Sequence, residues 1–206
     1  MSEKLFGLDE IKLIGDSNYL LQKNRILKKI AKSLSETGAI LGNEIKDNYA
    51  HIASNYTELP CKVSVGEKYR DLPYLVMDFP RHFDDQKTFS FRVLFLWGHY
   101  FNFSLHLGSD LIDKDSLFQF LSSVDKEIYF CIHQTPWEHY FTEDNFKLGS
   151  EVTSNDISNQ LIKNKFIKIS ERFEFQDIKD IAHQSIEVFR FLTEIASLTT
   201  KNKFDR

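Results

Sequence analysis

Two neighbouring segments of this sequence alternate bulky apolar residues with other residues, and both place the bulky residues at odd positions. These residues are Phe89, Phe91, Val93, Phe95 and Trp97 in the first segment, and Phe101, Phe103, Leu105 and Leu107 in the second. A period of two is typical of strands that bury one face. Both strands can turn their odd residues to the same core only if an odd number of residues joins them. We therefore predict an antiparallel hairpin with a three-residue loop over 98–100, which pairs Trp97 with Phe101.

This register also determines the second face of the sheet. It places three pairs opposite each other: Arg92 with His106, Leu94 with Ser104, and Leu96 with Asn102. The same alternation recurs in two further segments, with the apolar residues at odd positions in 75–79 and at even positions in 128–132. If all these strands share one sheet, its second face carries Tyr74, Asp78, Arg92, Asn102, Ser104, His106, Tyr129, Cys131 and His133.

The composition of this second face permits two interpretations. A solvent-facing surface would normally carry Lys, Glu and Thr, whereas oriented polar groups on a rigid sheet are typical of a ligand-binding floor. In the other interpretation helices cover the face, and its polar groups satisfy one another as buried pairs, such as Asp78 with Arg92. The sequence leaves both interpretations open. It predicts no metal site, because no two histidines lie four residues apart, and it indicates no cofactor.

The N-terminal part of the chain carries a helical pattern. Apolar residues recur about every 3.6 positions between Leu27 and Tyr56, and Asp16 or Ser17 is a natural N-cap. A single helix over 17–57 would be about 60 Å long and would overhang a compact chain of this size. We therefore expect a break or kink at 38–42, where two glycines weaken the helix. The alternative is an overhang that meets a partner subunit.

Beyond residue 60 the pattern becomes that of a β protein. Residues 61–175 contain several short strands, including 127–133, together with short helices, and a C-terminal helix is expected over 176–197. Short loops between strands and helices at both ends of the chain predict an α+β fold, in which an antiparallel sheet is flanked by a long or broken N-terminal helical region and a C-terminal helix. The 206 residues show no linker and no internal repeat, so a single domain over 1–206 is expected.

Charge and cysteine content narrow the class of protein. A net charge of −4 gives nucleic acid little to bind, and no apolar run is long enough to span a membrane. The N-terminus shows no export signal. Two cysteines, Cys61 and Cys131, are too few for a disulfide framework, so we expect unpaired thiols and a cytoplasmic location.

Two local features remain. Residues 136–141 concentrate aromatic side chains beside a turn, which favours a loop folded onto the core and leaves a lid or a partner patch as the alternative. Residues 69–107, with Tyr-Arg-Asp-Leu-Pro-Tyr, Asp-Phe-Pro-Arg and Phe-Leu-Trp-Gly in order, resemble a group of uncharacterised hypothetical proteins of Bacteroidota-type bacteria. That resemblance implies no activity and no site residue.

Three functions follow as expectations. The first is binding of a small molecule or a partner segment on the second face of the sheet, without chemistry at that site. The alternative is an oligomerisation or scaffold protein, which forms a homo-oligomer through residues 17–57. The third is an acid-base enzyme that uses His106, Arg92 and Asp78 as proton acceptor, cation and orienting carboxylate.

Overall fold

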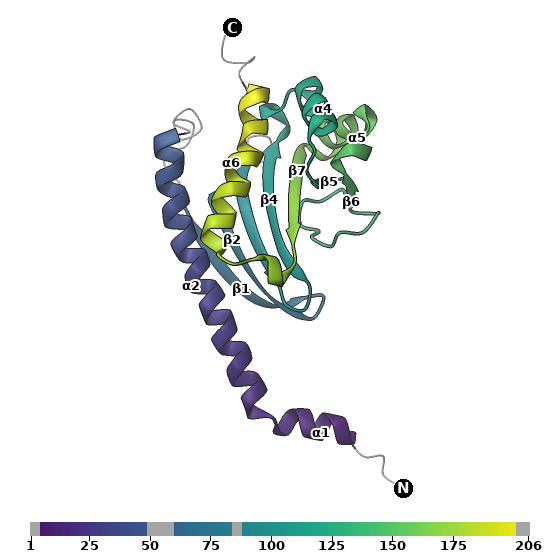
Figure 1. Cartoon of the computed structure of the whole chain (residues 1–206). Coiled ribbons are helices and arrows are strands. Elements are labelled where there is room, and N and C mark those ends of the chain that lie inside the picture. The colour runs from purple at the N-terminus through teal and green to yellow at the C-terminus, as the bar shows by residue number, and fades with distance from the viewer. Residues whose placement is uncertain (1–4, 49–59, 84–87, 201–206) are drawn as a thin grey trace.

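The computed structural model describes residues 5–48, 60–83 and 88–200 and contains one seven-stranded antiparallel sheet (Figure 1). The strands are β1 (Lys62–Tyr69), β2 (Leu72–His82), β3 (Phe89–Leu96), β4 (Tyr100–Gly108), β5 (Tyr129–Cys131), β6 (Phe146–Leu148) and β7 (Phe166–Phe173). Their order in the sheet is β1-β2-β3-β4-β7-β5-β6. The helices are α1 (Leu8–Gly15), α2 (Ser17–Asn48), α4 (Lys114–Ser123), α5 (Ser154–Asn159) and α6 (Ile181–Thr200). The predicted α+β class is therefore confirmed.

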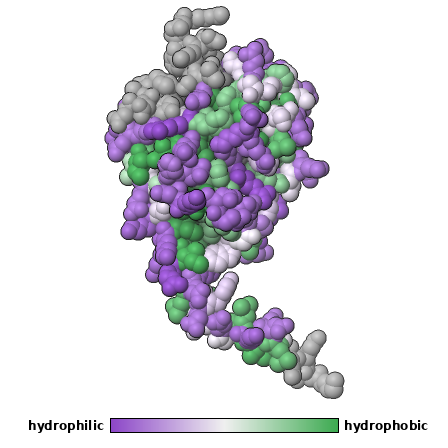
Figure 2. Space-filling model, viewed as in Figure 1, coloured by the Kyte–Doolittle hydropathy of each residue, from purple (hydrophilic) through white to green (hydrophobic). Residues whose placement is uncertain are grey.

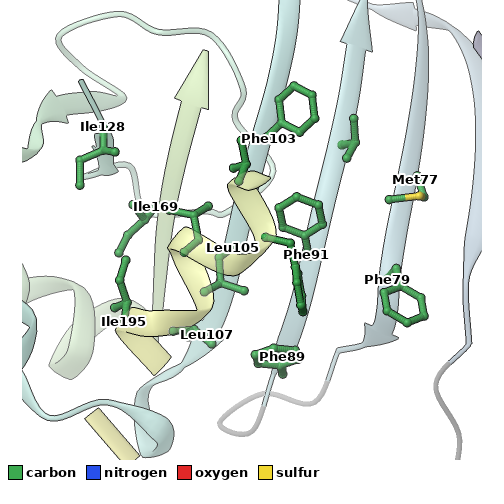
Figure 3. Close-up of a cluster of buried hydrophobic side chains, with 14 of the residues drawn as sticks. Met77, Phe79, Phe89, Phe91, Phe103, Leu105, Leu107, Ile128, Ile169 and Ile195 are labelled. Atoms are coloured by element: carbon green, nitrogen blue, oxygen red, sulfur yellow. The ribbon is translucent and has the colours of Figure 1, made fainter. Parts of the chain in front are cut away.

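The odd face of the sheet forms the core, as the alternation predicts. The helices α2 and α6 pack on this face, and the ring of Phe91 on β3 meets the ring of Phe189 on α6 edge to face with centroids 5.3 Å apart. Figure 3 shows the same layer, in which Phe79, Phe91 and Phe103 come from neighbouring strands. All three rings are at most 1% exposed. The abundant phenylalanine thus fills the space between the sheet and the two helices.

The hairpin between β3 and β4 has the predicted parity but a different register. Leu96 pairs with Tyr100, so the three-residue loop is 97–99 rather than 98–100, and Arg92 lies across from Ser104, not from His106. The predicted register is wrong by two residues. Gly98 has φ +77°, and the backbone N–H of His99 donates to the carbonyl of Leu96. The third residue of this turn needs a positive φ, which glycine adopts most easily. The loop therefore forms where Gly98 occupies the third position.

The predicted break in the N-terminal helix is also wrong. Helix α2 runs without interruption for 32 residues, starting after Asp16, whose carboxylate accepts from the backbone N–H of Tyr19. A methyl group on Gly38 would lie 2.3 Å from the Sγ of Cys61. The glycine therefore allows the helix to approach the chain leading into β1 closely, and it does not interrupt the helix. Residues 49–57 of the predicted helical region lie outside the described residues.

The overhang predicted as the alternative is present. Helix α1 and the first part of α2 extend away from the sheet as an N-terminal arm, defined here as residues 5–26 (Figure 1). Every side chain of the arm is exposed except Lys23, whose Nζ lies 2.8 Å from a carboxylate oxygen of Glu67 on β1. The arm therefore contributes almost nothing to the core.

Two further element boundaries differ from the predictions. The strand expected over 127–133 is limited to β5, which pairs with β6 and β7. The C-terminal helix begins at residue 181 instead of 176, because Asp180 accepts from the backbone N–H groups of Ala182 and His183 and so caps it. No helix in the described residues is both long enough and apolar enough to cross a membrane.

Candidate functional site

The even face of the sheet is covered, although not by helices. Residues 132–145, called the covering loop here, lie over the middle of this face. The Nζ of Lys168 on β7 lies 3.0 Å from the carbonyl oxygen of Pro136 and 2.6 Å from that of Glu138. Eight polar residues of the even face are each at most 7% exposed: Asp78, Ser90, Arg92, Asn102, Ser104, His106, Lys168 and Ser170. The structure therefore buries a polar layer between the sheet and the covering loop.

Arg92 and Asp78 form the centre of this layer. They are direct cross-strand partners on β3 and β2. The Arg92 Nε donates to Asp78 Oδ1 at 2.6 Å and its Nη2 donates to Oδ2 at 3.0 Å, a bidentate ion pair. The guanidinium carbon also lies 4.7 Å from the ring centre of Trp137 in the covering loop. The predicted pairing of Asp78 with Arg92 is thus confirmed, and both charges are buried.

His139 of the covering loop connects this ion pair to Lys168. Arg92 Nη1 lies 3.2 Å from His139 Nε2, and Lys168 Nζ lies 3.0 Å from His139 Nδ1. A guanidinium group can only donate, so Nε2 accepts and the proton of the neutral imidazole sits on Nδ1. That proton needs an acceptor, which a neutral Lys168 amine supplies through its lone pair. The two amine hydrogens then point to the carbonyls of Pro136 and Glu138, and every group is satisfied.

The electrostatics of the layer agree with this assignment. Burial is the largest cause that lowers the pKa of Lys168, to about 7, and the positive charge of Arg92 lowers it further. Burial is the largest cause that holds the pKa of both His139 and His106 well below the ordinary value; a protonated Lys168 and the charge of Arg92 lower it further. The two imidazoles are therefore neutral at pH 7, and the Arg92 and Asp78 charges offset each other.

The covering loop is anchored to the β1–β2 turn by Glu138. Burial would raise the pKa of Glu138, but hydrogen bonds from the Tyr69 hydroxyl and from the backbone N–H groups of Tyr140 and His139 bring it below the ordinary value. The guanidinium of Arg70 lies 4.0 Å over the ring of Tyr140. The β1–β2 turn thus holds the covering loop in two ways: Tyr69 bonds to Glu138, and Arg70 packs on Tyr140.

The structure brings only some of the predicted site residues together. Ser104 Oγ lies 3.1 Å from His106 Nε2 on the same strand, beside the Arg92 pair. Both polar atoms of Asn102 are buried and have no hydrogen-bond partner among the described residues, and the same holds for the hydroxyls of Ser90 and Ser170. Asn102 is the predicted residue whose hydrogen-bonding capacity is left unused.

The other predicted residues lie at the margin of the polar layer. The Tyr74 ring lies over Gly66 and meets the ring of Tyr69 edge to face. Tyr129 packs against Phe141 with ring centroids 4.6 Å apart. His133 lies beyond the end of β5, where its Nδ1 accepts from the backbone N–H of Thr135. These three residues therefore do not converge with Arg92.

Sequence reasoning missed Lys168, His139 and Glu138. Lys168 follows the same alternation as the other strands, because its odd neighbours Ile167 and Ile169 face the core. Extending the parity argument to β7 would have placed Lys168 on the polar face. The two covering-loop residues carry no such periodic signal.

The described residues contain no group of three or more side chains able to hold a metal ion. Cys61 and Cys131 are both unpaired, as expected from the sequence. Burial raises the pKa of the Cys131 thiol, so it is protonated and unreactive at neutral pH.

Comparisons with known proteins give little further information. No family model matches the sequence, and a search of curated proteins finds no match. A solved structure of a conserved hypothetical protein from Pyrococcus furiosus aligns with a TM-score of 0.42 and 10% sequence identity, over 84% of this chain and 99% of that chain. A similarity at this level carries no argument about function.

Proposed function

We propose that this protein is an assembly protein that binds a protein partner through its N-terminal arm. The observation that carries this proposal is the exposure of apolar side chains along the arm, which Figure 2 shows as hydrophobic patches on the projecting segment. Ten large hydrophobic residues are at least 40% exposed there: Leu5, Phe6, Leu8, Ile11, Leu13, Ile14, Tyr19, Leu20, Leu21 and Ile26.

The energetics support a protein interface. Burying one Leu, Ile or Phe side chain contributes about 1.5 to 3 kcal/mol, so leaving nine of them in water forgoes a large stabilisation. Scattered exposed apolar residues are normal on protein surfaces, but a contiguous apolar patch marks an interaction site. Within α1, Leu8, Ile11 and Ile14 are spaced three residues apart and so share one face, the pattern by which a helix docks into a groove.

Light scattering tests this proposal. We expect the full chain to associate at micromolar concentration, and a variant lacking residues 1–16 to remain monomeric at the same concentration. The matched control is Ile162→Asp, which changes an isoleucine that is 69% exposed outside the arm. A full chain that stays monomeric at high concentration and retains no partner when purified from its own cells would contradict the proposal.

A second candidate function rests on Asn102. A buried carboxamide with a free oxygen and a free N–H₂ matches a second amide, which can donate and accept at the same two positions. Opening of the covering loop would admit such a ligand to the even face. Glutamine and asparagine are suitable probes, and a thermal shift with either that disappears in Asn102→Leu supports binding. Identical melting temperatures with and without these probes would eliminate this second function.

A further inference from the structure

A groove lies at the base of the arm, beside the loop end of the β3–β4 hairpin. It has a volume of about 800 Å³ and opens to solvent. Its apolar lining is Ile26, Ile30, Phe95, Trp97, Phe101, Phe175, Ile178 and Ile181. The groove is therefore built from α2, the β3–β4 hairpin and the segment leading into α6. One of its lining residues, Ile26, is also the last residue of the arm.

We propose that the occupant of this groove is helix α1 of a second copy of the chain, in a dimer in which each copy inserts its α1 beside the other's sheet. This inference rests on the proposed assembly function and names its partner and docking surface. Each copy carries one apolar arm and one apolar groove, so reciprocal insertion covers both in both copies and closes the assembly. The chain's own α1 projects away from the body (Figure 1) and contributes no residue to the lining of the groove.

The charges of the two surfaces are complementary. Lys29 and Lys179 line the groove. The acidic residues beside them are engaged elsewhere, because Glu36 lies 3.7 Å from Lys32 and Asp180 caps α6. Helix α1 begins with Asp9 and Glu10, so its first turn is acidic. The lining therefore carries two lysines and two acidic residues, and Lys29 and Lys179 are the groups that can pair with the acidic first turn of α1.

The size of the two surfaces also fits a dimer. A stable interface usually takes about 20 to 30 residues from each partner. The arm over residues 5–26 and the eight apolar residues of the groove, which share Ile26, make 29 residues and so fall in this range for each copy. A small ligand in the groove would leave the arm uncovered, and pairing of two arms would leave the groove uncovered.

A charge-exchange experiment on the full chain tests this arrangement. One variant is Asp9→Lys, and the other carries both Lys29→Glu and Lys179→Glu. Each variant alone places like charges at the contact, so we expect its dimer dissociation constant to rise at least fivefold in light scattering. A 1:1 mixture restores opposite charges at both contacts, and we expect mixed dimers with the wild-type dissociation constant. All three positions are exposed, so the fold should be retained.

The outcomes separate this inference from the proposed function. If Ile11→Asp is monomeric while the two groove substitutions leave the dimer unchanged, the arm binds elsewhere, and the groove proposal is overturned while the assembly function stands. A mixture that fails to form mixed dimers also overturns the groove proposal. A wild-type chain that does not self-associate, but binds a different protein through its arm, refutes the second copy as occupant. A wild-type chain with neither property overturns both proposals.

Discussion

The polar layer and the N-terminal arm distribute their side chains in opposite ways. Under the covering loop, an arginine, a lysine, an aspartate and two histidines are each at most 7% exposed. Along the arm, leucine and isoleucine side chains are exposed, and two of them, Leu5 and Leu8, are more than 80% exposed. Each region reverses the usual partition of polar and apolar residues.

The buried polar groups and the exposed apolar groups differ in whether the chain itself supplies their contacts. The two buried cations of the polar layer, Arg92 and Lys168, find their partners within the chain, because the covering loop brings carbonyl groups and His139 to them. The apolar side chains of the arm have no cover among the described residues, which is the observation behind the proposed partner interface. The comparison shows that buried charged groups can find their partners within the chain, whereas the exposed apolar side chains of the arm find none among the described residues.

The largest expected effect comes from breaking the ion pair of the polar layer. Arg92→Ala leaves the Asp78 carboxylate buried without its partner and should lower the free energy of unfolding by about 3 to 5 kcal/mol in urea denaturation. The matched control is Arg172→Ala, since this arginine is exposed, pairs with Glu174 and should cost less than about 1 kcal/mol. A loss below 1 kcal/mol for Arg92→Ala would show that water reaches the layer and would favour the ligand-floor interpretation.

The second largest effect is expected in the pH dependence of the free energy of unfolding, through Lys168 of the polar layer. The pKa of Lys168 is about 7 in the folded state against an ordinary value of 10.5, so the unfolded state binds more protons between these values. The free energy of unfolding therefore rises with pH in this window, by about 2 to 3 kcal/mol between pH 7 and pH 9. Lys168→Met should lack this contribution whatever its absolute stability. Parallel curves for the two proteins would mean that Lys168 is not buried as an amine.

A smaller effect tests how α2 is held on the sheet. Gly38→Ala places a methyl group against Cys61 and should destabilise by about 1 kcal/mol, and Cys61→Ala should relieve most of this loss. Gly42→Ala is the matched control, because its nearest neighbour, the Phe79 ring, is 3.9 Å away. That control should gain up to about 1 kcal/mol from helix propensity. Equal effects at the two glycines would contradict the close approach.

The smallest effect is expected at the arm itself. Removal of residues 1–16, measured at a concentration where the protein is monomeric, should change the free energy of unfolding by less than about 0.5 kcal/mol, because the side chains of residues 5–16 are all exposed. A loss of 2 kcal/mol or more would show that the arm folds back onto the body in solution.

The sequence predicted the features that follow from periodicity. Odd and even residues separate correctly across the sheet, which is why the contact between Asp78 and Arg92 could be predicted. The register could not, because parity is unchanged by a shift of two residues and only the positive φ of Gly98 selects the loop. Gly38 was read as a helix breaker because its close neighbour, Cys61, is distant in the sequence.

The candidate site was predictable only in part for a related reason. The strands supply Arg92 and Lys168 by alternation, but His139 and Glu138 arrive from a loop whose path has no period. Whether the polar face is open or covered depends on that path, so the sequence left the question open.

The position of β7 has a consequence for synthesis of the chain on the ribosome. Strands β1 to β4 are consecutive hairpins, whereas β7 comes from residues 166–173 and pairs with both β4 and β5. Strands β4 and β5 therefore cannot form their pairing with β7 until the ribosome has synthesised residues 166–173. Until β7 is made, the edge of β4 that pairs with it has no partner strand, and unpaired strand edges are where partly folded chains tend to associate.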